Sequence, residues 1–219
     1  MATRENHSLP NRHTGYMAKS GHGKSQALKQ NPDYPRHRDD RVLLWDPGRD
    51  HKAKRFTNAL EYYQAIKKAM GSGKGFRLAW TGEQCPKEFE RWSAMAFACM
   101  DGQRTLNLVI EELAAVQPSS GSAAPNFSIL CNQSRKYAGV MHWTTQRSTE
   151  ISKTVLDQTE IFYIGKPGKM VTKGQADRLA RVAECPNGAD DLQRLKPLQF
   201  YHATNDGSKL ITLKYKKNI

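Results

Sequence analysis

The stretch AKSGHGKS, residues Ala18 to Ser25, decides the fold of this chain. It fits the phosphate-binding loop pattern, in which a small residue and four variable positions precede Gly-Lys-Ser. Glycines allow consecutive main-chain N–H groups to turn inward toward phosphate oxygens, because no Cβ obstructs the approach. A helix that begins at Lys24 would add the positive end of its dipole. The stretch therefore predicts a nucleotide-phosphate site at the start of a helix.

Each position of this loop has an expected role. The Lys24 ammonium would reach the β- and γ-phosphates of ATP, and the Ser25 hydroxyl would be a ligand of Mg²⁺. Two features depart from the ideal pattern, since Ala18 stands where glycine is commoner and the preceding HTGYMA is a poor match to a buried strand. The alternative is a surface loop rich in Gly, Ser and Lys. The nucleotide-binding residues predicted from the loop are Ala18, Lys19, Ser20, Gly21, His22, Gly23, Lys24 and Ser25.

An apolar strand that ends in two acids supplies the partner that such a loop requires. In LNLVIEEL, residues 106–110 are mostly apolar and Glu111 and Glu112 follow, at the edge where open α/β sheets place their ligands. Glu111 is expected to hold Mg²⁺, directly or through water, although aspartate is commoner there. Glu112 is expected to polarise the attacking water. The alternative is an exposed acidic pair at the N-terminus of the next helix.

The charge of the chain favours a polyanionic partner. The 219 residues carry 34 Lys and Arg against 21 Asp and Glu, a net charge of +13, which is too basic for a typical enzyme of small-molecule metabolism. The positive charge is spread along the chain. It is therefore more typical of a surface that follows a nucleic-acid backbone than of a short basic tail. Solubility, or attraction to an anionic membrane, is the alternative explanation.

Cysteine spacing and hydropathy argue against two further classes. The four cysteines show no C-x-x-C spacing and no nearby histidine pairing, so we expect no zinc site and reduced thiols. No apolar run approaches 18 residues. We therefore expect no transmembrane segment, and a protein that is soluble or held at a membrane by other means.

Alternating strand and helix signals predict an α/β fold with a mostly parallel central sheet and helices on both faces. We expect a flexible N-terminal arm over residues 1–12, a core over 13–165, and a C-terminal helix and β-hairpin over 166–219 that pack on the core. The predicted strands cover 41–47, 75–80, 105–113, 139–146 and 160–165, and the predicted helices cover 24–30, 57–70, a segment from Pro86, 127–135, 150–156 and 175–183.

Two of the predicted helices have defined apolar stripes. The first is expected to begin at Thr57 as N-cap, and the second has Pro86 in its first turn. The stripes are Leu60, Tyr63, Ile66 and Met70 in the first helix, and Phe89, Trp92, Ala96 and Cys99 in the second.

Other aromatic and histidine residues are assigned mainly to structure. His22 is expected to shape the phosphate loop and His142 to lie in the core. Tyr62 and Tyr63, beside two lysines, are candidates for stacking on nucleic acid, although helix packing is favoured for at least one. The residues Trp80, Trp92 and Trp143 are predicted to be core.

The segment SRKYAGVMHWTTQRSTEI, residues 134–151, resembles the FtsK/HerA division of phosphate-loop motor ATPases. In that division an Arg-x-x-Gly turn leads into an apolar strand that ends in Thr-Gln-Arg. The glutamine at the strand end senses the γ-phosphate, which by position is Gln146 here. LLWDP, residues 43–47, resembles the division's second strand and would place Asp46 near the nucleotide. The resemblance covers roughly residues 13–165 and implies a RecA-like P-loop NTPase core that uses ATP and Mg²⁺.

The same division uses an arginine from a neighbouring subunit. In the comparable region after the strand this chain has no arginine before Arg178, so Arg147 and Arg135 are the candidate arginine fingers. Lys166 or Lys169 would be a weaker substitute, because an ammonium is a point charge without the planar fork of a guanidinium.

Within the division the chain most resembles the genome-packaging ATPases of tailless, tectivirus-like viruses with an internal membrane. From the sequence we expect neither the membrane spans and winged-helix module of FtsK proteins nor the N-terminal barrel of HerA proteins. The resemblance implies a homo-oligomeric ring that translocates double-stranded DNA, docked on capsid or membrane-associated vertex proteins, and located in the virion and the host cytoplasm. Basic residues within 48–56 and 166–173 are candidates for the DNA pore or for docking.

Two other functions are consistent with the sequence. The first is a conjugative or phage-extrusion ATPase that transfers DNA at a membrane. The second, from a different class, is a basic DNA-binding protein without catalysis, whose phosphate loop has decayed. Ala18 and Glu111 favour the second, since both depart from the usual pattern.

Overall fold

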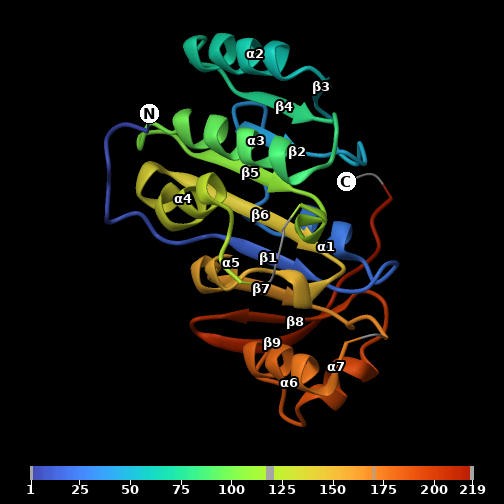
Figure 1. Ribbon diagram of the computed structural model, residues 1–219. Coiled ribbons are helices and arrows are strands. Elements are labelled where there is room, and N and C mark those ends of the chain that lie inside the picture. Colours follow the sequence, from blue (N-terminus) through green and yellow to red (C-terminus); the bar gives the residue numbers. More distant parts are fainter. Residues whose placement is uncertain (1, 117–120, 170, 218–219) are drawn as a thin grey trace.

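The computed structural model describes residues 2–116, 121–169 and 171–217; residue 1 of the predicted arm and residues 170, 218 and 219 of the predicted extension lie outside these ranges. Within them nine strands form one sheet, in the order β3-β4-β2-β5-β6-β1-β7-β8-β9 (Figure 1). All pairings from β3 to β7 are parallel, and β8 and β9 add an antiparallel hairpin. The predicted α/β class and mostly parallel sheet are therefore confirmed. The strands are β1 (Thr14–Met17), β2 (Arg41–Trp45), β3 (Lys54–Phe56), β4 (Phe76–Trp80), β5 (Leu106–Ile110), β6 (Gly139–Thr145), β7 (Ile161–Ile164), β8 (Gln199–Thr204) and β9 (Gly207–Thr212).

Helices cover the two faces of the sheet unequally. Successive side chains of a strand point to opposite faces, and the larger core cluster, which contains Leu43 and Trp45 of β2, also contains buried residues from each of the helices α2 to α7. The smaller cluster contains Val42 and Leu44 of β2 and, among the described helices, residues of α1 alone (Figure 1). The helices are α1 (Lys24–Gln30), α2 (Ala59–Gly71), α3 (Pro86–Ala98), α4 (Pro125–Gln133), α5 (Lys153–Gln158), α6 (Lys173–Val182) and α7 (Ala189–Arg194), with single 3-10 turns η1 (Leu113–Ala115), η2 (Ser134–Tyr137) and η3 (Ser148–Glu150).

The segment before the phosphate loop is a central strand, although its residues are a poor match to the pattern of a buried strand. β1 pairs with β6 on one side and β7 on the other, and all four of its residues are buried. Gly15 lies directly under the indole of Trp143, and a Cβ at residue 15 would overlap that ring. The glycine that weakens the strand pattern is therefore the residue that lets a tryptophan fill the core.

We expect Gly15→Ala to lower the free energy of unfolding by about 1–3 kcal/mol, the usual cost of overpacking a filled core. The measurement is urea unfolding. The control is Gly174→Ala in α6, where an added Cβ meets no atom within 4 Å, so the stability should stay the same or rise slightly. Equal effects of the two substitutions would contradict the packing argument.

Helix α2 corrects two details of the prediction. Its N-cap is Asn58, not Thr57, because the Asn58 side chain accepts hydrogen bonds from the N–H groups of the first turn at 2.9 and 3.2 Å. The buried stripe contains Tyr62 and Ile66, whereas Leu60 and Tyr63 are 65% and 44% exposed. The predicted stripe, which includes Leu60 and Tyr63, and the observed stripe, which includes Tyr62, share Ile66. The observed stripe faces the sheet, because Tyr62 packs against β4 and its hydroxyl donates to the Leu78 carbonyl.

The remaining core predictions agree with the structure except at Cys99, which is the C-cap of α3 and is only partly buried. Pro86 occupies the first turn of α3, and Phe89, Trp92 and Ala96 are buried. Trp80 and Trp143 are also buried. The Trp92 indole N–H donates to the Tyr62 hydroxyl at 3.1 Å, which satisfies its polar atom inside the core. These contacts join α2 and α3 on one face of the sheet.

Both ends of the described chain lie against the core. Residues 2–12 form no helix or strand, but the Thr3 and Asn6 N–H groups donate to the carbonyls of Met100 and Lys136. At the other end, the Gln26 side chain in α1 both donates to and accepts from the main chain of Lys216. The C-terminal segment therefore runs beside the helix that follows the phosphate loop. None of the described helices is long and apolar enough to span a lipid bilayer.

Candidate nucleotide-binding site

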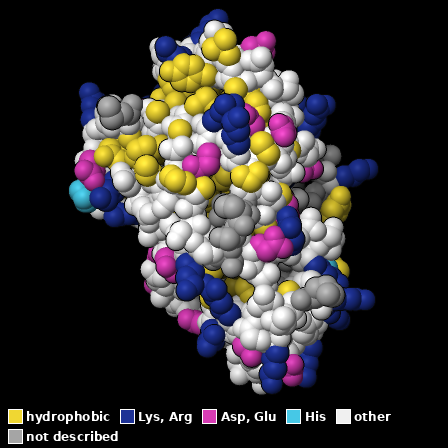
Figure 2. Space-filling model, viewed as in Figure 1, with side chains coloured by type: hydrophobic (Ala, Val, Ile, Leu, Met, Phe, Trp, Pro, Cys, Tyr) yellow, Lys and Arg dark blue, Asp and Glu magenta, His cyan; other side chains and the backbone are white. Residues whose placement is uncertain are grey.

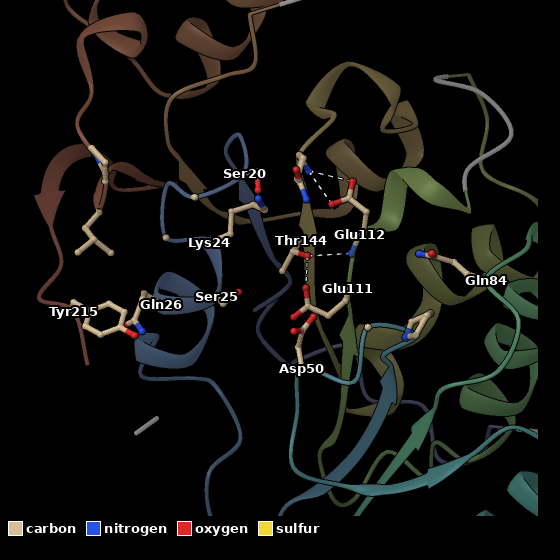
Figure 3. Close-up of a pocket in the computed structure, with 17 residues that line it drawn as sticks. Ser20, Lys24, Ser25, Gln26, Asp50, Gln84, Glu111, Glu112, Thr144 and Tyr215 are labelled. Carbon is tan, nitrogen blue, oxygen red and sulfur yellow. Dashed lines mark hydrogen bonds between the residues drawn. The ribbon is translucent and has the colours of Figure 1, made fainter. Parts of the chain in front are cut away.

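A cleft of about 650 Å³ lies at the carboxyl edge of the parallel strands (Figure 3). Its walls come from the phosphate loop, the loop after β2, the ends of β5 and β6, and the C-terminal extension. Crevices at the carboxyl ends of parallel strands are where open α/β sheets bind their ligands. The lining residues are Ser20, Gly21, Gly23, Lys24, Ser25, Gln26, Pro47, Gly48, Asp50, Gln84, Glu111, Glu112, Thr144, Gln146, Pro197, Leu198 and Tyr215.

The phosphate loop has the backbone conformation that its glycines predict. Gly21 and Gly23 have φ values of 75° and 92°, in the left-handed region that favours glycine. Gly23 is the N-cap of α1, and a Cβ there would lie 2.6 Å from Cδ2 of Leu198. The His22 carbonyl accepts a hydrogen bond from the Leu198 N–H at 3.1 Å. The C-terminal extension therefore packs directly against the loop, a role that the sequence did not predict for it.

Gly23→Ala should weaken ATP binding about tenfold. The substitution adds roughly 1–2 kcal/mol of left-handed backbone strain, together with the overlap on Leu198, and about 1.4 kcal/mol corresponds to a factor of ten in Kd. Titration with a fluorescent ATP analogue measures the effect. Gly168→Ala is the control, because an added Cβ there meets nothing within 4 Å. An unchanged Kd in Gly23→Ala would show that the loop tolerates a side chain at this position.

Lys24 points over its own loop. Its Nζ donates to the carbonyls of Ala18 and Lys19 at 2.9 and 3.4 Å. Burial lowers the pKa of this ammonium, and the nearby carboxylates of Glu112 and Glu111 oppose that effect. The positive charge therefore lies between the loop and the two acids. The adjacent Ser25 hydroxyl has no hydrogen-bond partner within the described ranges.

Glu111 is held from two sides. One carboxylate oxygen accepts from the Thr144 hydroxyl at 2.6 Å, and the other lies 2.7 Å from His51 Nε2. Burial raises the pKa of the Glu111 carboxyl, but the hydrogen bond and charge of His51, with Thr144 and Lys24, outweigh burial and leave the pKa below its ordinary value. The carboxylate form is therefore favoured.

His51 is the site residue that sequence reasoning missed. It lies in the turn after β2, and Asp46 shapes that turn by accepting from the N–H groups of Asp50 and His51 at 2.8 and 3.1 Å. Asp46 is thus at the nucleotide edge, as the second-strand resemblance predicted, but its contacts are to the main chain. The one sequence signal for His51 was its position five residues after Asp46, in the turn that follows the strand.

Glu112 has an unusual backbone. Its φ and ψ are 49° and 58°, a left-handed conformation that costs a non-glycine residue energy and tends to occur at functional sites. The turn lets its N–H donate to the Thr144 hydroxyl at 3.1 Å, and its carboxylate accepts from the Gln146 N–H at 3.2 Å. In Figure 3 the Glu111 carboxylate points toward the side of Ser25, and Glu112 points toward the end of β6.

The residues present fit a magnesium ion bound together with a nucleotide. Each Glu111 oxygen accepts one hydrogen bond and has a further lone pair, and the Ser25 hydroxyl opens on the same cleft. Among the described residues, no cluster of three or more His, Cys, Asp or Glu side chains forms a metal site by itself. This donor set suits Mg²⁺, which usually takes one or two protein ligands and completes its shell with phosphates and water.

The two candidate arginine fingers lie at opposite ends of β6. Arg147 follows the strand, beside the cleft, and its guanidinium pairs with Glu150 at 2.8 Å. Arg135 precedes the strand, roughly 20 Å away along its seven residues. Its guanidinium donates to the carbonyls of His7 and Leu9 at 2.9 and 2.6 Å. Of the two, Arg147 is the one beside a nucleotide cleft.

Comparison with known proteins gives one relative in sequence and several in fold. No protein-family model matches the chain. Protein P9 of Pseudoalteromonas phage PM2 is 31% identical over 159 residues, which cover 72% of this chain and 70% of that protein.

Two solved structures show the same fold. The genome packaging NTPase B204 of Sulfolobus turreted icosahedral virus 2, in complex with AMPPCP, has a TM-score of 0.73 and 14% identity, and the match covers 94% of this chain and 100% of that one. The bacterial conjugative coupling protein TrwBdeltaN70 has a TM-score of 0.65 and 11% identity, over 97% of this chain and 87% of that one.

Proposed function

The chain belongs to the family of Protein P9 of Pseudoalteromonas phage PM2, and from this membership and its P-loop ATPase fold we propose that it is an ATP-hydrolysing motor that translocates double-stranded DNA, packaging a viral genome into a preformed capsid. The fold, shared with the packaging NTPase B204 and the coupling protein TrwBdeltaN70, supports the resemblance to the FtsK/HerA division that the sequence predicted. Genome packaging is the activity named for B204, whose chain is matched over its full length.

One observation carries the proposal. Lys24, Glu111, Glu112 and Gln146 come from distant parts of the chain and line one cleft at the carboxyl edge of the sheet. A surface loop that matched the phosphate-loop pattern by chance would have no reason to face a buried strand that ends in two acids. The departures at Ala18 and Glu111 leave this arrangement intact.

Each residue of the cleft has its own role in binding and hydrolysing ATP. The loop N–H groups and Lys24 would bind the β- and γ-phosphates, and Ser25 and Glu111 would hold Mg²⁺. Bound Mg²⁺ neutralises the phosphate oxygens and withdraws electrons from the γ-phosphorus. Glu112 would orient the attacking water and take its proton. Gln146, adjacent to Glu112, would contact the γ-phosphate and transmit its presence to the end of β6.

The net positive charge of the chain supports DNA as the molecule along which the motor moves. A motor that binds DNA at any sequence needs Lys and Arg contacts to phosphates, and the net charge of +13 is in keeping with this need. In this proposal the subunits form a ring at a capsid vertex, docked on capsid or membrane-associated proteins, and the protein is present in the virion and in the host cytoplasm. A trans-acting arginine, with Arg147 as the better-placed candidate, would complete each site.

The second candidate is a conjugative or extrusion ATPase. The likeness to the coupling protein TrwBdeltaN70, over 97% of this chain, favours it. Presence of the protein in purified virions, with empty capsids when Glu112 is replaced, would support packaging. Normally filled capsids would favour DNA transfer instead.

A DNA-stimulated ATPase assay tests the function. Wild-type protein should hydrolyse ATP, and duplex DNA should increase the rate. Lys24→Ala is the control, because it removes the ammonium that the γ-phosphate needs. Turnover that persists in Lys24→Ala would mean that another site or a contaminant is responsible. Absence of turnover in the wild type, even with DNA, would favour the DNA-binding protein with a decayed loop.

A further inference from the structure

A second cleft, which we call the basic cleft, lies on the other side of the loop after β2. It has a volume of about 600 Å³ and shares Asp50 with the nucleotide cleft. Arg77 lines it from β4. Because Arg77 and Ala79 are two residues apart in this strand, their side chains lie on the same face of the sheet, and Ala79 belongs to the core cluster on the α1 side. The basic cleft therefore opens on the sheet face that carries fewer helices. Its lining residues are Lys29, Tyr34, Pro35, Arg36, Arg49, Asp50, His51, Lys52, Arg55 and Arg77.

Positive charge dominates this cleft. Six of its ten lining residues are Lys or Arg and one is Asp, and within the described ranges none of the six forms an ion pair with a carboxylate. On the side of the molecule in Figure 2, by contrast, Lys and Arg lie scattered and several adjoin Asp or Glu. Uncompensated cations in a concave surface concentrate a positive potential and attract an anion.

Two of the four arginines of the cleft lie against one aromatic ring. The guanidinium carbons of Arg36 and Arg77 each lie 5.9 Å from the centre of the Tyr34 ring. The Arg77 side chain donates to the Pro35 carbonyl at 2.9 Å and to the Tyr34 hydroxyl at 3.3 Å. These contacts hold Arg77 in place without neutralising it, so its charge stays available to a ligand.

A chain of hydrogen bonds connects the basic cleft to the nucleotide cleft. Arg77 donates to the Tyr34 oxygen, and the same hydroxyl lies within hydrogen-bonding distance of His51 Nδ1, 2.9 Å away. His51 Nε2 in turn lies 2.7 Å from a Glu111 carboxylate oxygen. The loop that carries His51 also carries Arg49 and Lys52 of the basic cleft. One short segment thus lines the basic cleft and contacts Glu111 of the nucleotide cleft.

We propose that the basic cleft binds backbone phosphates of duplex DNA, and that the chain Arg77–Tyr34–His51–Glu111 couples this binding to ATP hydrolysis. The inference rests on the proposed function and adds the DNA site and its link to the nucleotide. A phosphate in the cleft competes with the Tyr34 hydroxyl for the Arg77 guanidinium. The Tyr34 and His51 hydrogen bonds then rearrange, and Glu111 becomes freer to bind the metal. Tyr34 and His51 are positioning residues in this scheme.

Duplex DNA fits the cleft better than a small anion does. A single phosphate carries at most two negative charges, whereas the cleft has six cations from five segments of the chain. Arg36, Arg49, Lys52 and Arg55 are exposed, as expected for a surface that a polymer crosses. A DNA backbone, with one negative charge per nucleotide on each strand, can neutralise several of these cations at once.

The DNA site is tested with two matched triple variants. One replaces Arg49, Lys52 and Arg55 with Ala; the other replaces Lys67, Lys68 and Lys87, which are exposed on α2 and α3. Affinity for a fluorescent 30-base-pair duplex is measured by anisotropy from 50 to 200 mM salt. The slope of log K against log salt should become shallower by about 2–3 in the first variant, since each lost phosphate contact contributes about 0.9. It should change by less than about 1 in the second.

Other outcomes of the DNA measurement overturn the site. Equal changes in the two variants would show that only net charge matters. Full displacement of DNA by 10 mM inorganic phosphate at constant ionic strength would show a small-anion site. A change of oligomeric state in the first variant alone, with unchanged affinity per subunit, would show that the cleft is a subunit interface.

The coupling is tested with Tyr34→Phe, which keeps the ring and removes the hydroxyl. At saturating DNA the stimulation of ATP hydrolysis should fall toward onefold, while the Kd for DNA should change less than threefold. If Tyr34→Phe does not fold, Arg77→Lys replaces it, because an ammonium keeps the charge but not the fork that contacts both Tyr34 and Pro35. Wild-type-like stimulation in a folded variant overturns the coupling. Absence of stimulation in the wild type itself overturns the proposed function instead.

Discussion

Replacing Glu112 with glutamine should lower the rate of ATP hydrolysis by about 10²–10⁴-fold, the usual contribution of a general base. Binding of ATP should change little, because the phosphate loop and Lys24 are untouched. The amide oxygen of glutamine can still accept from the Gln146 N–H, which holds the carboxylate at 3.2 Å. The left-handed turn at residue 112 is therefore retained, and the loss belongs to proton transfer.

Single-turnover hydrolysis and ATP titration measure the two quantities separately. Glu61→Gln, on the exposed side of α2, is the matched control and should hydrolyse ATP at the wild-type rate. A fall in ATP affinity that accounts for the whole effect would show that Glu112 binds the nucleotide and is no base. Retention of the rate within about threefold would exclude Glu112 from the chemistry.

The sequence predicted the parts of the site that depend on residue type at a strand end. Lys24, Ser25, Glu111 and Glu112 could be placed in one cleft because carboxyl ends of parallel strands meet at one edge. His51 could not, because it lies in a turn whose path depends on Asp46 accepting two main-chain N–H groups. Such contacts have no periodic signature in the sequence.

The fold shows the same division between local pattern and distant contact. The strands β4 and β6 were predicted within one residue of their bounds, whereas the strand predicted at β5 ended three residues too late, because it included Glu111 and Glu112. β1 was doubtful because Gly15 breaks its pattern, and its pairing with β6 and β7 overrides that local weakness. The short β3 and α7 were not predicted, since three and six residues give too few positions to show a period. The choice of stripe in α2 likewise required contact with β4.

The second large effect that we expect is a loss of folding stability in acid, caused by two buried histidines. His13 Nδ1 accepts the Met141 N–H at 3.2 Å, and its Nε2 contacts the Ser134 hydroxyl at 2.9 Å. His142 Nδ1 lies 3.2 Å from the Tyr16 hydroxyl. Burial, with nearby positive charge, lowers the pKa of His13 to about 3, and burial lowers the pKa of His142 to about 4. Both rings are therefore neutral in the folded protein at pH 5.

We expect acidification from pH 7 to pH 5 to lower the free energy of unfolding by about 4 kcal/mol through these two residues. In the unfolded chain each ring takes up a proton below its ordinary pKa of 6.5, while in the folded protein neither does so until the pH falls toward 4 and 3. The unfolded state therefore binds more protons, and stability falls as the pH falls. One pH unit corresponds to about 1.4 kcal/mol for each histidine, or about 2 kcal/mol each at pH 5.

Urea unfolding at pH 7 and pH 5 measures this loss, and the variant His142→Gln isolates one half of it. Glutamine offers the Tyr16 hydroxyl an acceptor but does not titrate, so the loss between the two pH values should shrink by about 2 kcal/mol, whatever the absolute stability of the variant. His37→Gln is the control, because His37 is exposed and surrounded by water in both states. An identical loss in the wild type and in His142→Gln would contradict this expectation. It would mean that His142 takes up its proton in the folded protein, and that the contact with the Tyr16 hydroxyl stabilises the charged ring.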